Sequence, residues 1–116
     1  MVDEMTLEIP VDPAFALTAR AFVASIAQDV GIDRATVDDL RLAVSELVAN
    51  AVEVSAHDPI RLAIAPDTAG LRLTVTGAGV MNDGVPVDRQ LLLQTLFEEA
   101  RFDEDGNVVI VVPAAS

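Results

Sequence analysis

The sequence predicts an α+β two-layer sandwich, in which a mostly antiparallel sheet is covered by helices on one face. A short strand comes first, followed by two helical stretches, a hairpin of alternating polarity, a third helix and a second hairpin. The strand-helix-strand alternation that is typical of parallel sheets is missing from this order. With 116 residues, the chain is expected to form a single domain over residues 1–116, in the order β-α-α-β-β-α-β-β.

The first half of the chain predicts a strand and two helices. Thr6–Ile9 alternates polar and apolar residues, as a strand does. Asp12-Pro13 supplies an N-cap and a first-turn proline for a helix that ends at Gly31, and Asp33 can cap the second helix, which ends before Pro59. Apolar residues recur every three or four positions in both helices: Phe15, Ala19, Phe22, Val23, Ile26 and Val30 in the first, and Val37, Leu40, Val44, Leu47, Ala51 and Val54 in the second.

The second half predicts two hairpins separated by a loop and a helix. Residues 60–65 and 71–76 alternate in polarity around a turn at 67–70, which indicates an antiparallel hairpin with one buried face. A glycine-rich loop follows at 77–86, and then a helix is expected over 87–101. Its inward residues are expected to be Leu91, Leu92, Leu96 and Phe97. The last hairpin is expected to pair 102–105 with 108–112, and the second of these strands is apolar enough for a central position.

Charge and composition exclude several classes of function. The formal net charge is −12, all seven basic residues are arginine, and only 3% of the residues are aromatic. An acidic surface repels phosphate backbones, and stacking platforms for bases are scarce, so we expect no direct binding to nucleic acid. The charge favours a basic protein partner, or it serves only to keep a chain with 52% hydrophobic residues in solution.

The sequence also bears on compartment and assembly. Disulfides and thiolate metal sites are excluded because the chain has no cysteine. No apolar run reaches the roughly 20 residues of a membrane span, and the first residues are acidic, so we expect a cytoplasmic protein that does not bind membranes. The lysine-free composition, rich in alanine and valine, suggests a bacterial protein. The high apolar fraction and an exposed sheet edge are compatible with a homodimer or a heterodimer.

The second helix carries the residue pair with the clearest chemical meaning. Glu46 and Asn50 are four positions apart, so their side chains lie on the same face, one turn from each other. A carboxylate beside a carboxamide can hold a Mg²⁺-bound phosphate and orient a hydroxyl group or a water. The alternative is an exposed helix face with two ordinary polar residues.

The order of elements and this pair resemble the GHKL, or Bergerat-fold, ATPase domain, and in particular the bacterial anti-sigma-factor serine kinases. The stretch Arg41-Leu-Ala-Val-Ser-Glu46-Leu-Val-Ala-Asn50-Ala51 is similar to the N-box of that family. The stretch from Leu92 to Phe102, followed by a hairpin with a valine-rich strand, is similar to its C-terminal third. The resemblance implies that Asn50 coordinates Mg²⁺ and that Glu46 is the catalytic base.

Other parts of the family's nucleotide site are altered. Where the family has Asp-x-Gly-x-Gly, this chain has Gly77-Ala78-Gly79-Val80-Met81, so the carboxylate that accepts the adenine amino group is missing. Losing such a hydrogen bond costs roughly 1.5–3 kcal/mol. Residues 80–86 leave little room for the family's phosphate lid, and its second glycine motif is replaced around Val87 and Arg89. Gly77 and Gly79 are then either remnants of a nucleotide site or turn glycines.

Arg20 is the residue that the resemblance connects with protein partners. An arginine at this place on the first helix contacts the sigma factor and its STAS-type antagonist in the resembling family. The alternative is a surface arginine paired with a nearby acid such as Asp12 or Glu8.

Three functions follow from these residues. The first is an anti-sigma-like regulator that binds a sigma factor or a STAS-type anti-anti-sigma protein without ATP turnover and needs no cofactor. The second is an active ATP- and Mg²⁺-dependent serine/threonine kinase with a shortened lid. The third is a structural subunit that has inherited only the fold.

Overall fold

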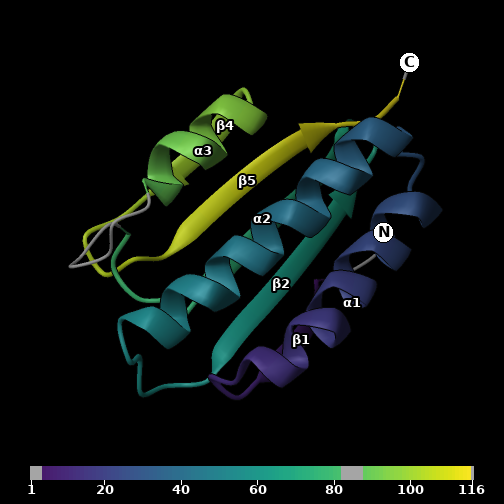
Figure 1. Ribbon diagram of the computed structural model, residues 1–116. Helices are drawn as coiled ribbons and strands as arrows, with labels where there is room; N and C mark the ends of the chain where they lie inside the picture. The colour runs from purple at the N-terminus through teal and green to yellow at the C-terminus, as the bar shows by residue number, and fades with distance from the viewer. Residues whose placement is uncertain (1–3, 82–87, 116) are drawn as a thin grey trace.

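A computed structural model describes residues 4–81 and 88–115. The elements follow one another as β1 (Met5–Ile9), a 3-10 turn η1 (Pro13–Phe15), α1 (Ala16–Asp29), α2 (Arg34–Glu53), β2 (Ile60–Asp67), β3 (Gly70–Thr76), α3 (Arg89–Leu96), β4 (Glu99–Phe102) and β5 (Val108–Pro113). Figure 1 shows the helices on one side of the sheet, with α1 and α2 running side by side across it. The predicted fold class and element order are therefore confirmed.

The sheet has five strands in the order β1-β2-β3-β5-β4, and every neighbouring pair is antiparallel. The register places Leu62 opposite Val75, and Leu73 opposite Ile110, so that apolar side chains of neighbouring strands share one face. β5 pairs with β3 on one side and β4 on the other, which is the central position predicted for the valine-rich strand.

Side-chain caps begin α2 and the 3-10 turn before α1, whereas α1 itself has Phe15 at its N-cap and no side-chain cap. The Asp12 carboxylate accepts a hydrogen bond from the backbone N–H of Ala14, and the Asp33 carboxylate accepts one from Thr36 at the start of α2. The core lies between the helices and the sheet. Its largest fully buried side chains are Leu40, Leu47, Ile60, Leu62, Ile64, Leu71, Leu73, Leu93, Ile110, Val23, Val37 and Val44. Among the described residues, no helix combines the length and the apolar character needed to span a membrane.

The third helix and the last hairpin differ from the prediction. The helix ends at Leu96, because Phe97 is already extended, and the expected helical residues 99–101 belong to strand β4. Pairing of Glu99–Phe102 with β5 outweighs the local helical preference of this stretch. The segment 103–107, which was expected to begin with strand residues, is a turn in which the Asp103 carboxylate accepts hydrogen bonds from the backbone of Asp105 and Asn107.

Two residues that were predicted to face the core are exposed instead. Phe15 lies in the 3-10 turn and is 40% exposed, because the first turn does not continue the α1 face. Leu91 is 58% exposed, whereas Leu93 is fully buried. The inward face of α3 includes Arg89 and Leu93, which are four positions apart.

Candidate functional site

Three polar residues form one stripe on α2. Glu46, Asn50 and Glu53 are spaced by four and then three residues, so they share a helix face beside the core. Asn50 is completely buried, and the Glu46 side chain is 26% exposed. The structure thus places the predicted pair next to each other and adds Glu53, which the sequence reading did not single out.

The Asn50 carboxamide is directed into the loop that follows β3. Its Nδ2 lies 2.9 Å from the carbonyl oxygen of Ala78, 3.4 Å from that of Gly79 and 3.3 Å from that of Val80. Three carbonyl oxygens require a donor, which fixes the orientation of the amide group. Its Oδ1 is buried and has no hydrogen-bond partner in the described part of the chain. Asn50 therefore holds the loop against α2.

Gly77 and Gly79 shape this loop through their backbones. Their φ angles are 85° and 82°, a region that L-residues with side chains rarely adopt. A Cβ on Gly77 would lie 2.3 Å from the carbonyl oxygen of Pro59, and one on Gly79 would lie 2.4 Å from Cγ2 of Val54. Neither position has space for a side chain, so the backbone itself excludes an aspartate at position 77.

The turn between β4 and β5 packs against the same loop. A Cβ on Gly106 would lie 2.1 Å from the carbonyl oxygen of Gly79 and 2.7 Å from the backbone nitrogen of Val80. Gly106 also has a positive φ, and it is buried. Two backbone segments that are far apart in sequence thus meet directly beside the C-terminal end of α2.

Arg89 occupies the space between the start of α3 and the polar stripe of α2. Its Nε donates a hydrogen bond of 2.8 Å to Oε2 of Glu46, and its two terminal nitrogens bind the two carboxylate oxygens of Glu53 at 2.9 Å each. The arginine is only 4% exposed. We call these three residues, Arg89, Glu46 and Glu53, the Arg89 cluster.

Arg89 and Glu53 each stabilise the ionised form of the other. The hydrogen bonds that Arg89 donates to Glu53 raise the pKa of the Arg89 guanidinium, burial lowers it, and the bond to Glu46 raises it further. The hydrogen bond from Arg89 lowers the pKa of the Glu53 carboxyl. The bidentate geometry to Glu53 is the one in which a guanidinium fork matches a carboxylate. Arg89 is thus held as a cation between two anions.

Comparison with models of known protein families identifies the family of this chain. Residues 9–112 match the model of the histidine kinase-like ATPase domain. The chain belongs to this family. A search among curated protein sequences finds no match to this chain.

A solved structure shares the fold of this histidine kinase-like ATPase domain. The crystal structure of the RsbU and RsbW domains of Rv1364c from Mycobacterium tuberculosis superposes with a TM-score of 0.68 at 23% sequence identity. The likeness covers 97% of this chain and 34% of that one, so this chain spans about a third of its length. At this identity the comparison concerns the fold.

The residues present do not fit the Mg²⁺-nucleotide that the family name implies. Glu46, the expected base, is bound to Arg89. Asn50 is completely buried, and its amide nitrogen faces carbonyl groups of the chain. Gly77 has neither the carboxylate for adenine nor the space for one. The expectations for the short lid and for Val87 concern residues 82–87, which lie outside the described part of the chain.

Arg20 lies on α1, and none of the hydrogen bonds described above for Asn50 and the Arg89 cluster involves it. It is half-buried, and its Nε has no hydrogen-bond partner in the ranges 4–81 and 88–115. Within these ranges it forms no ion pair with Asp12 or Glu8. The guanidinium is therefore not neutralised by either acid that the sequence offered as its neighbour.

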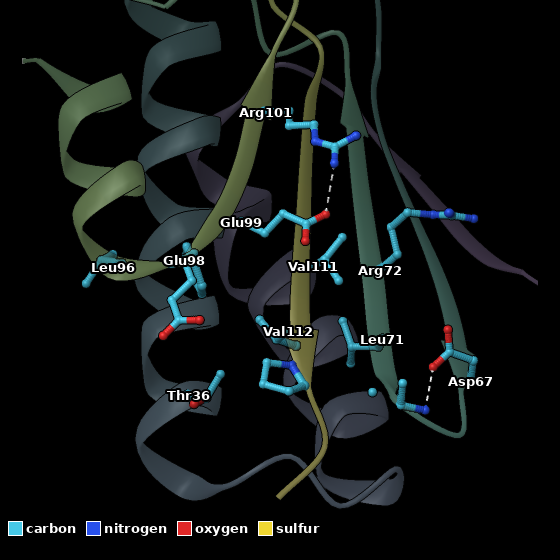
Figure 2. Close-up of a pocket in the computed structure, with 14 residues that line it drawn as sticks. Thr36, Asp67, Leu71, Arg72, Leu96, Glu98, Glu99, Arg101, Val111 and Val112 are labelled. Carbon is cyan, nitrogen blue, oxygen red and sulfur yellow. Dashed lines mark hydrogen bonds and ion pairs between the residues drawn. The ribbon is translucent and has the colours of Figure 1, made fainter.

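A separate groove lies at the other end of α2 from Asn50. Figure 2 shows it over β3 and β5, with Arg72 and Glu99 on the strands on either side of Val111 and with Thr36 at its border. Glu46, Asn50 and Arg89 do not line it. Asp67, Glu98 and Glu99 offset Arg72 and Arg101, so the groove has no single sign of charge.

Other polar residues of the chain have structural roles or are exposed. Asp38 pairs with Arg41, and Asp103 organises its own turn. His57 is exposed after the end of α2. Among the described residues, no three His, Cys, Asp or Glu side chains form a cluster that could hold a metal ion.

Sequence reasoning missed Glu53 and the role of Arg89. One signal was present: Glu53 continues the spacing of Glu46 and Asn50 by one more turn, which predicts a polar stripe of three residues. A second was that an arginine stands just after Asp88, the N-cap of α3, where the family has glycine. The ion pair between this arginine and Glu46 could not be predicted from local sequence patterns, because 43 positions separate the two residues.

Proposed function

We propose that this protein is an anti-sigma-type regulator that binds a protein partner and does not turn over ATP. The partner would be a sigma factor or a STAS-type antagonist, as the resemblance to anti-sigma-factor serine kinases implies. Membership of the histidine kinase-like ATPase family and the shared fold support the relationship. The observation that supports loss of turnover is the 2.8 Å ion pair between Arg89 and Glu46.

The chemistry explains why this ion pair matters. A general base must accept a proton from a hydroxyl group or a water held within hydrogen-bond reach. A carboxylate oxygen that accepts a charge-assisted bond from a buried guanidinium is already occupied and does not face a substrate. Binding of a protein partner needs none of this chemistry, so the fold can serve as a recognition surface while the polar residues of α2 stabilise it.

Arg20 is proposed to belong to the partner surface. It is half-buried on α1, and its Nε has no hydrogen-bond partner among the described residues. Arginine is a type of residue that often anchors interfaces. In a chain of net charge −12, it offers a local cation to an acidic group of the partner.

Titration calorimetry tests the absence of nucleotide binding. Mg-ATP and Mg-ADP are titrated into the purified protein, and no binding is expected at micromolar concentrations. Transfer of label from γ-labelled ATP to a candidate STAS protein provides the second readout, with Glu46→Gln as the matched variant. Micromolar affinity, or transfer that disappears in Glu46→Gln, would establish the kinase instead.

One observation favours the kinase as the second candidate. Oδ1 of Asn50 is buried without a partner in the described residues, and a carboxamide oxygen is the atom that the family uses for Mg²⁺. This candidate requires the Arg89 cluster to open and Asn50 to become accessible. The calorimetric experiment distinguishes the two functions directly.

A further inference from the structure

The Arg89 cluster joins two helices that a bound ligand would otherwise have to bridge. Glu46 and Glu53 lie on α2, and Arg89 is the first residue of α3. All three hydrogen bonds are between 2.8 and 2.9 Å. The arginine side chain is 5% exposed, whereas those of Glu46 and Glu53 are 26% and 41% exposed. The Arg89 side chain is thus the most buried of the three, and the two carboxylates lie closer to the solvent.

We propose that the Arg89 guanidinium is a built-in substitute for the nucleotide, an internal cationic ligand that holds α3 against the polar stripe of α2. The inference deepens the proposed function and rests on it for the absence of nucleotide. It assigns to one side chain the positive charge that a Mg²⁺ ion would bring to acidic residues and the bridge between elements that a bound nucleotide would form.

The shape of the guanidinium is essential to this role. Its Nε serves Glu46 while its terminal nitrogens serve both oxygens of Glu53, so one planar group satisfies two carboxylates that are seven residues apart on the helix. An ammonium group has the same charge but is a compact point donor without this fork. Without the cation, Glu46 and Glu53 would be left as like charges on one helix face.

The loop beside the cluster is held by contacts within the chain. Asn50, between the two glutamates on the stripe, is bonded to the carbonyl groups of residues 78–80. Gly79 of that loop is in turn covered by Gly106 of the β4–β5 turn. Within the described residues, the Nδ2 atom of Asn50 is therefore bonded inside the chain, whereas its Oδ1 atom has no partner.

Chemical rescue tests the proposal without any protein partner. Arg89→Ala removes the guanidinium, and we expect the melting temperature to fall by roughly 5–10 °C, because a buried charge is taken from two paired carboxylates. Millimolar methylguanidinium should restore about 2 °C or more, because it binds only the folded variant with the vacated site. Methylammonium, which has the charge without the fork, should restore less.

Arg101→Ala is the matched control. Arg101 pairs with Glu99 at 3.3 Å, and its side chain is 76% exposed. Its removal should lower the melting temperature by less than about 2 °C, and methylguanidinium should not restore the difference. Wild-type protein measured with the same additives corrects for the general effect of guanidinium ions on stability.

If Arg89→Ala does not fold, Arg89→Lys takes its place. This variant keeps the charge, and an intermediate melting temperature is expected. The proposal is overturned if Arg89→Lys matches the wild type, if Arg89→Ala costs no more than Arg101→Ala, or if a folded Arg89→Ala gains nothing from methylguanidinium or as much from methylammonium. Failure of the proposed function would be seen in a different experiment, the calorimetric titration, as binding of Mg-ATP to the wild-type protein.

Discussion

The Nε of Arg89 lies 2.8 Å from Oε2 of Glu46, which joins the first residue of α3 to the middle of α2. The resemblance to the anti-sigma-factor serine kinases implies that this glutamate is the catalytic base. Here it forms part of an ion-pair cluster. The Oε2 atom of Glu46 is thus engaged by an arginine that lies 43 positions away in the sequence.

The hydrogen bonds of Asn50 should make it important for stability. Asn50→Ala leaves the buried carbonyl group of Ala78 without its donor, so the free energy of unfolding should fall by about 1–3 kcal/mol. Asn50→Asp should cost more, because a carboxylate would face three carbonyl oxygens. Urea unfolding followed by circular dichroism measures both. Gln94→Ala, which removes an exposed carboxamide on α3, should have little effect. A similar value for Asn50→Ala and Gln94→Ala would contradict this role.

Restoring the family's aspartate at position 77 should fail. A Cβ on Gly77 would meet the Pro59 carbonyl oxygen at 2.3 Å, in a backbone with φ of 85°. Gly77→Asp should therefore destabilise the fold by roughly 2 kcal/mol or more and should not create nucleotide binding. Gly31→Asp is the control, because Gly31 has φ of 84° but nothing within 4 Å of its Cβ position. Its cost should be limited to backbone strain of about 1 kcal/mol. Gain of Mg-ATP binding in Gly77→Asp, seen by calorimetry, would refute this account.

Stability should decrease in acid through Glu53. The hydrogen bond from Arg89 lowers the pKa of this carboxyl from its ordinary 4.5, so folding favours the ionised form. The resulting stabilisation is present above the ordinary pKa and is lost as the pH falls through the lowered pKa of the folded state. Melting temperatures between neutral and acidic pH should show wild type above Glu53→Gln at neutral pH, with the gap closing below the ordinary pKa. A gap that does not change with pH would exclude this linkage.

Two more carboxylates add to the loss of stability in acid. The pKa of Asp33 is lowered chiefly by the backbone N–H of Thr36, and that of Asp103 chiefly by the backbone N–H of Asn107. Both therefore stabilise the fold above their ordinary values, and this contribution disappears as they become protonated. Asp33→Asn should reduce the pH dependence, because an asparagine can still cap α2 without titrating. An unchanged acid transition in Asp33→Asn would remove this residue from the explanation.

Arg20→Glu should weaken binding to the partner while leaving the fold intact. Its Nε has no hydrogen-bond partner among the described residues, so reversal of its charge should cost little stability. If it is an anchor of the interface, affinity should fall by roughly 2 kcal/mol or more. Titration with a candidate sigma factor or STAS protein measures this. Arg34→Glu makes the same change of charge at an exposed position on α2 and should have a smaller effect. Equal effects of the two variants would indicate long-range repulsion and not a contact.

The sequence by itself determined the elements whose signals are local. The spacing of Val37, Leu40, Val44 and Leu47 specifies one buried face of α2, and the Asp33 carboxylate fixes its start. The alternation of residues 60–65 and 71–76 specifies the hairpin of β2 and β3. These features depend on neighbours within one or two helical turns or across one tight turn, which is why periodicity and capping were sufficient to predict them.

The tertiary structure decided the features that join distant parts of the chain. Residues 99–101 form a strand because β5 offers them a pairing edge, although their local preference is helical. Glu46 binds Arg89 across 43 positions, and Gly106 covers Gly79 across the third helix. No local pattern encodes such contacts, because burial and charge pairing depend on which surfaces the packed sheet and helices bring together. The sequence identified the polar residues of α2, but only the packing of α3 determined that Glu46 and Glu53 are paired with an arginine.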